Sequence, residues 1–157
     1  MDSFGRIMEI IITVVLLFIV PLYIIAGIRE ISNQIYINTQ TTLFTDTVRN
    51  CGYIDEDMYN SYVNALGVTD NVYDVKMIHS CQMYDSNYDR YYMEYHNEEI
   101  LNGVISGGYY MNQGDLFNVN VVSKGGSLFN KMTSLIMEAQ NDSVLVCYGG
   151  IIRDEAY

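Results

Sequence analysis

Three oxygen-bearing side chains, Asp85, Asn87 and Asp89, occupy every second position of one polar stretch. This is the ligand spacing of a helix–loop–helix calcium site, where carboxylate and amide oxygens surround the ion. Such a loop requires glycine at its sixth position and a glutamate at its twelfth. This chain has Arg90 and His96 at those positions, so we expect a solvated loop and no metal ion.

Histidine occurs only at positions 79 and 96, on two different predicted segments. Because the chain has 19 acidic residues, a carboxylate near either ring is expected by chance, and a metal or acid–base role has little support. The motifs G-x-S-x-G, H-E-x-x-H and G-x-x-x-x-G-K do not occur. We interpret the glycine pairs at 107–108, 125–126 and 149–150 as turns. We therefore expect no enzymatic activity and no cofactor.

The three cysteines, Cys51, Cys81 and Cys147, do not form the C-x-x-C spacing of a zinc ribbon or a redox motif. In an extracellular domain one disulfide would be expected. Cys51 and Cys81 are the favoured pair, since both flank surface-type segments whereas Cys147 lies in an apolar strand. Three unpaired thiols are the alternative.

Glu9 is a carboxylate within the otherwise apolar stretch 7–28. A charge at the centre of a bilayer costs about 2.5–3.5 kcal/mol on insertion scales and normally needs a partner. Alternatively, Glu9 lies at the membrane edge, protonated or reaching the head groups. Pro21 lacks a backbone donor and crowds the preceding turn, so it predicts a kink.

The stretch 7–28 positions Glu9 and Pro21. It is long enough to span a bilayer, which needs ~20 apolar residues. A cleaved secretory signal would have a shorter apolar core followed by a small-x-small site. Arg6 precedes the stretch, and Arg29 is followed at once by Glu30, so orientation is weakly specified. We favour the N-terminus inside and the acidic C-terminal portion outside.

The sequence continues to Gly52 without Pro or Gly, which favours one helix over 7–50 ending at that glycine. Its apolar residues form two stripes at helical spacing, namely Ile28, Ile31 and Ile35, then Ile37, Thr41, Phe44 and Val48. At about 100° per residue the stripes lie on nearly opposite faces. The helix must therefore change partner near Tyr36, or bend or break there.

Residues 51–157 alternate between helical and strand patterns. Helices are predicted over 56–66, 98–105 and 128–139, capped by Asp55, Asn97 and Ser127. Strands are predicted over 73–84, 91–95, 116–122 and 143–148. The expected fold class is α+β, with a long N-terminal helix and a small head in which short helices cover one face of an antiparallel-rich sheet.

The net charge and the tyrosine content indicate which kinds of partner the chain can bind. The formal net charge of −11 repels phosphates, so no nucleic-acid partner is expected. Tyrosine is frequent, at 15 residues, which favours a packed or adhesive surface, although partly buried sheet tyrosines would explain most of them.

Gly5, the charged Arg6, Glu9 within an apolar helix and Pro21 together resemble type IV pilin-like subunits. In that family a prepilin peptidase cuts after the glycine, the N-terminal helices bundle in the filament core, and the glutamate meets a neighbour's N-terminal amine. Segments 44–53, 71–76, 114–121 and 148–157 look like pilin-like proteins encoded with tight-adherence pilus machinery in Gram-positive anaerobes. The resemblance covers most of the chain through short motifs.

This resemblance implies a leader or cytoplasmic tail over 1–6, a transmembrane rod helix over 7–50 and an extracellular head over 51–157. The implied function is a structural subunit of a surface filament, whose partners are copies of itself or related pilins, the membrane, a pilus assembly platform and a prepilin peptidase. Cleavage after Gly5 would make Glu9 the fourth mature residue, where the family usually has it fifth. An uncleaved accessory protein of a pilus, secretion or conjugation apparatus, and a membrane-anchored binding ectodomain, are the alternatives.

Overall fold

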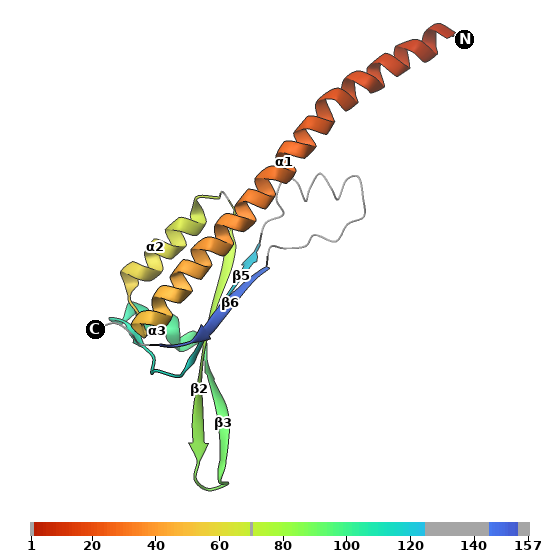
Figure 1. The fold of residues 1–157 in the computed structure, drawn as a ribbon. Helices are drawn as coiled ribbons and strands as arrows, with labels where there is room; N and C mark the ends of the chain where they lie inside the picture. The colour runs from red at the N-terminus through yellow and green to blue at the C-terminus, as the bar shows by residue number, and fades with distance from the viewer. Residues whose placement is uncertain (1, 70, 125–144, 154–157) are drawn as a thin grey trace. The chain divides into compact units, whose positions relative to one another are not determined.

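A computed structural model describes residues 2–69, 71–124 and 145–153. In chain order the elements are α1 (Asp2–Cys51), β1 (Tyr53–Ile54), α2 (Glu56–Gly67), β2 (Tyr73–Asp85), β3 (Arg90–His96), α3 (Glu98–Ile105), β4 (Tyr109–Tyr110), β5 (Leu116–Ser123) and β6 (Leu145–Ile151) (Figure 1). This confirms the predicted α+β class with a long N-terminal helix. The predicted helix over 128–139 and its cap Ser127 lie outside the described residues.

The chain divides into two compact units, and each is described by itself. Among the described residues, one contains residues 2–34, and the other contains residues 35–69, 71–124 and 145–153. The first contributes the apolar N-terminal part of α1, and the second contains the sheet and the remaining elements. The predicted boundary after residue 50 follows the end of the helix, whereas the second unit already begins within it.

Helix α1 is one continuous element of 50 residues and runs through Pro21. This agrees with the prediction of a single uninterrupted helix. It begins five residues before the predicted start. Gly52 ends it: this glycine has a φ of 70°, a left-handed conformation that suits a residue without a side chain, and its amide donates to the Val48 carbonyl at 2.8 Å.

Four antiparallel strands form the main sheet in the order β3-β2-β5-β6. In β5 the alternation predicted a buried face, and Phe117, Val119 and Val121 are indeed fully buried. A second sheet pairs β1 with β4, Tyr53 opposite Tyr110. Strands of two residues are too short to produce a periodic pattern, so this small sheet was not predicted.

The hydrophobic core of the second unit lies between the helices and the face of the sheet that bears Phe117. Helix α1 contributes Ile37, Phe44 and Val48, which are the apolar members of the second predicted stripe. Phe44 stacks on Tyr62 of α2 with ring centroids 4.3 Å apart, and its edge faces Phe117 at 6.5 Å. The C-terminal part of α1 is therefore an integral part of the head.

Two local predictions are wrong. Gly149 and Gly150 do not form a turn but pair within β6 with Asn118 and Phe117. A Cβ at Gly149 would lie 2.5 Å from the backbone carbonyl oxygen of Phe117, so the strand needs glycine for close approach. Asn97 does precede α3, but its side chain makes no capping hydrogen bond.

Candidate functional site: an apolar helix and a polar cluster

The N-terminal part of α1 presents an apolar surface. Seventeen large apolar side chains between Phe4 and Ile28 are 43–74% exposed. The helix contains the one stretch in the described residues that is long and apolar enough to cross a membrane, with mean hydropathy 2.9 and none of that stretch buried. Because none of this stretch is buried, it is compatible with membrane anchoring.

The four residues singled out for processing and assembly all lie on this exposed part of α1. Gly5 has no atom within 4 Å of the position its Cβ would take, so nothing in the described chain requires a glycine there. Arg6 and Glu9 are three residues apart and lie on the same side of the helix. The Thr13 hydroxyl donates to the backbone carbonyl of Glu9 at 2.8 Å, and the side-chain carboxylate of Glu9 takes no part in this hydrogen bond.

The two stripes of α1 have different environments. Ile28, Ile31 and Ile35 are 59–63% exposed, whereas Ile37 and Val48 are fully buried in the head. The helix does not break near Tyr36, and the second stripe packs in the head while the first stripe stays exposed, so a change of partner there remains a prediction.

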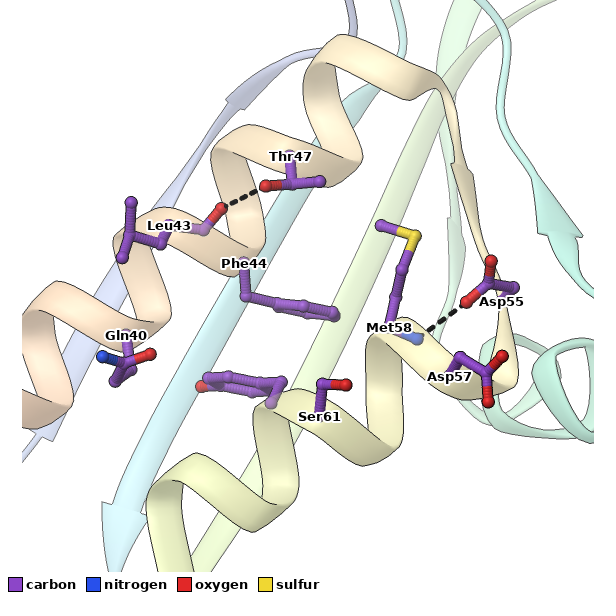
Figure 2. Close-up of a pocket in the computed structure, with 9 residues that line it drawn as sticks. Gln40, Leu43, Phe44, Thr47, Asp55, Asp57, Met58 and Ser61 are labelled. Carbon is purple, nitrogen blue, oxygen red and sulfur yellow. Dashed lines mark hydrogen bonds between the residues drawn. The ribbon is translucent and has the colours of Figure 1, made fainter.

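A groove of about 400 Å³ lies between α1 and α2. Figure 2 shows Phe44 and Met58 pointing into it, with Asp55 accepting a hydrogen bond from the Met58 amide at 2.7 Å. The other lining residues are Gln40, Leu43, Thr47, Asp57, Ser61 and Tyr62. These side chains offer an apolar floor with a polar rim, and they include no cysteine, histidine or lysine that could serve as a nucleophile or base.

Among the described residues, the hairpin of β2 and β3 carries most of the exposed tyrosines. Strand β2 pairs with β5 only as far as Ser80, and beyond that residue it pairs with β3 alone (Figure 1). Five tyrosines of this hairpin are 44–72% exposed: Tyr84, Tyr88, Tyr91, Tyr92 and Tyr95. The expectation that sheet tyrosines are partly buried does not hold here, because this ribbon has no second layer packed on it among the described elements.

The candidate calcium ligands form the turn of the same hairpin. Asp85 Oδ1 accepts from the Asn87 amide at 2.9 Å, and Asp89 Oδ1 accepts from the Tyr84 hydroxyl at 2.6 Å. Arg90, where the calcium loop needs glycine, begins β3 and lies 5.2 Å from the centroid of the Tyr88 ring. The carboxylates stabilise a four-residue turn in place of a twelve-residue loop.

His79 lies buried at the end of the core. Its Nδ1 is 2.8 Å from the Tyr109 hydroxyl and its Nε2 is 3.0 Å from Asp115 Oδ2. The same carboxylate oxygen accepts from the Asn112 amide at 2.9 Å. Burial, followed by the charges of Glu99, Cys81 and Asp115, raises the pKa of Tyr109 to about 12, so this hydroxyl stays protonated at neutral pH.

His96 lies directly opposite His79 in the β2–β3 ladder, with ring centroids 5.5 Å apart. Its Nε2 is 3.7 Å from Cys81 Sγ, and its Nδ1 is 2.5 Å from Glu99 Oε2. Burial raises the pKa of the Cys81 thiol, and the carboxylates of Asp115 and Glu94 add to this effect. Cys51, Cys81 and Cys147 are all free thiols in the structure, which agrees with the alternative of three unpaired thiols and not with a Cys51–Cys81 disulfide.

Sequence reasoning treated the two histidines and Cys81 separately. The signal that joins them was present in the predicted hairpin, since a turn centred between residues 87 and 88 places 79 opposite 96 and 81 opposite 94.

No family model, no curated protein and no solved structure matches this chain.

Proposed function

We propose that this chain is a non-enzymatic structural subunit of a type IV-like cell-surface filament, anchored in the membrane by α1 with its head outside. The observation that carries the proposal is the uncovered apolar surface of α1 between Phe4 and Ile28. A major or a minor pilin-like subunit would use this surface in the same way.

The size of this surface argues for a partner. Fully burying one such side chain contributes about 1.5–3 kcal/mol relative to leaving it exposed. Even at half that value, seventeen side chains amount to more than ~10 kcal/mol, comparable to the whole stability of a small domain. Lipid before assembly and sister helices after it are the two environments that supply this burial.

Glu9 favours sister helices over lipid alone. Glu9 is exposed on the apolar part of α1. In lipid its carboxylate would find no hydrogen-bond partner. A basic group from a neighbouring subunit would compensate for the lost hydration. If a prepilin peptidase cuts after Gly5, the new N-terminal amine of a neighbouring subunit is such a group. No atom of the described chain lies within 4 Å of a Cβ at Gly5, so packing does not oppose access of the peptidase to this residue.

The test is a comparison of Glu9→Gln with Glu56→Gln, an exposed glutamate in the first turn of α2. We expect sheared surface filaments to contain the wild-type chain. Glu9→Gln should leave the chain in the membrane but lower its amount in the filaments by about tenfold, the effect of ~1.4 kcal/mol per subunit contact. Glu56→Gln should leave both amounts unchanged. A wild-type chain that is abundant in the membrane and absent from all surface filaments would contradict the proposal.

The exposed tyrosines of the β2–β3 hairpin favour a second candidate, a membrane-anchored binding ectodomain. Under this alternative, substituting Tyr88 and Tyr91 with serine abolishes attachment to the target surface, and the chain forms no filaments. Intact-mass analysis adds a further distinction, because an uncleaved accessory protein or ectodomain would retain residues 1–5 after export.

A further inference from the structure

We propose that Cys81, Glu94 and His96 bind one divalent cation of the Zn²⁺ type on the β2–β3 ladder. This site is separate from the apolar helix, so it goes beyond the proposed filament function and does not depend on it. It also revises the expectation from sequence that this chain holds no metal ion.

The strand register places the three ligands on one face. Cys81 is the direct cross-strand partner of Glu94, and His96 is two residues further along β3. Side chains of direct partners, and of residues two apart, point to the same side of a sheet. The site therefore needs no loop rearrangement, because two hydrogen-bonded strands already hold its ligands.

The sulfur–nitrogen distance fits a tetrahedral cation. One ligand atom from each of the three residues lies within 4.8 Å of the other two. Zinc bonds of about 2.3 Å to sulfur and 2.0 Å to nitrogen imply a sulfur–nitrogen edge of about 3.5 Å in a tetrahedron. The distance from Cys81 Sγ to His96 Nε2 is 3.7 Å, so this edge of the tetrahedron requires only a small contraction.

Glu99 prepares His96 for this role. Its Oε2 lies 2.5 Å from His96 Nδ1, and a carboxylate in this position accepts the Nδ1 proton. The lone pair of the ring is then on Nε2, the atom that faces Cys81 Sγ. Metal-binding histidines in proteins are commonly oriented by such a carboxylate on the opposite ring nitrogen.

His79 is not a fourth ligand. Tyr109 and Asp115 already engage both of its ring nitrogens, at 2.8 and 3.0 Å. Cys81, Glu94 and His96 are each partly exposed, so water has access to the remaining coordination position. Sulfur and imidazole ligands favour Zn²⁺ over Mg²⁺ or Ca²⁺, which prefer oxygen alone.

The experiment uses the full chain, reduced and metal-free in a non-ionic detergent, and titrates it with Co²⁺ as a spectroscopic substitute for Zn²⁺. We expect one Co²⁺ per chain, a sulfur-to-cobalt charge-transfer band and the strong visible absorption of tetrahedral Co²⁺, all lost when Zn²⁺ is added. Cys81→Ser should abolish the charge-transfer band. Cys147→Ser, which removes the exposed cysteine of β6, is the matched control and should retain it.

Two further variants separate ligands from neighbours. Glu99→Gln should weaken Co²⁺ binding by about 10–100-fold, as removal of an orienting carboxylate does, while the charge-transfer band persists at saturation. His79→Gln should retain the band. A folded wild-type chain without the charge-transfer band, or a band that survives in Cys81→Ser, would overturn the proposal; near-ultraviolet circular dichroism establishes folding in each case.

Discussion

The guanidinium of Arg49 lies against the backbone of Gly150. A Cβ at Gly150 would be 2.7 Å from Arg49 Cζ, closer than real side-chain contacts allow. In this position Arg49 Nε donates to the Ile151 carbonyl at 3.0 Å and Nη1 bonds Asp46 at 2.7 Å. Asp46 in turn accepts from the Tyr148 hydroxyl. The last turns of α1 are therefore fastened to β6 through a contact that only glycine permits.

Gly150→Ala should destabilise the head by about 1–3 kcal/mol, because the new methyl group displaces the guanidinium from its hydrogen bonds. The control is Gly67→Ala at the end of α2, where a Cβ meets no atom within 4 Å and stability should not fall. Chemical denaturation of the full chain in detergent measures both. In an Arg49→Ala background the cost of Gly150→Ala should largely vanish, and an undiminished cost would show that the contact is not its cause.

Two buried threonines of α1 give opposite predictions for the same substitution. Both are fully buried, but Thr41 Oγ1 is 2.9 Å from the Tyr62 hydroxyl, whereas Thr45 Oγ1 has no hydrogen-bond partner among the described residues. Thr45→Val should stabilise the head by about 1 kcal/mol, since it removes an unsatisfied polar atom without changing shape. Thr41→Val should destabilise it by about 1–3 kcal/mol because it strands the tyrosine hydroxyl. Equal effects of the two substitutions would contradict the assignment.

The raised pKa of Tyr62 predicts that the head loses stability at alkaline pH. Burial raises its pKa from 10.0 to about 12, with the Thr41 hydrogen bond acting in the opposite direction. Between these values the unfolded chain has lost the proton and the folded chain retains it, so stability that is intact below the unfolded pKa is lost as pH rises towards the folded pKa. The loss amounts to about 2–3 kcal/mol.

Tyr62→Phe isolates this effect from the other tyrosines. Near pH 9 the variant should be less stable than wild type by about 1 kcal/mol, the value of one hydrogen bond, and by about pH 11.5 the order should reverse. Denaturant unfolding at the two pH values measures the difference. A gap that does not change with pH would mean that Tyr62 ionises normally in the fold.

Two of the three helix caps predicted from sequence lie in the described residues, and they differ in strength. Asp55 accepts from the Met58 amide at 2.7 Å at the start of α2, so Asp55→Ala should cost about 1 kcal/mol. Asn97 has a φ of −120° and a ψ of −57°, and its side chain makes no such bond. Asn97→Ala should therefore change stability by less than about 0.5 kcal/mol. Thermal unfolding of the two variants under identical conditions checks the pair.

These caps illustrate where sequence reasoning succeeds and where it stops. Residue type and spacing predicted the long helix, α2, the hairpin and β5, since each rests on local periodicity over five or more residues. They did not predict the backbone conformation of Asn97, which lacks the extended geometry of a cap, or the pairing of Gly149 and Gly150, which depends on β5 and Arg49, distant in sequence. The groups around Cys81 were missed because their proximity follows from the register of the hairpin, which was predicted as two strands without pairing its residues.

Two isoleucines of α1, two residues apart, separate the fold from the proposed assembly. Ile37 is fully buried in the head and Ile35 is 63% exposed. Ile37→Ala should therefore cost about 2–5 kcal/mol in the unfolding of the head, as deletion of a buried aliphatic side chain does. Ile35→Ala should leave that unfolding within about 0.5 kcal/mol of wild type, yet lower the amount of chain in sheared filaments, because it removes surface that only another molecule can cover. If Ile35→Ala alters neither property, the exposed stripe has no partner, and the helix acts only as an anchor.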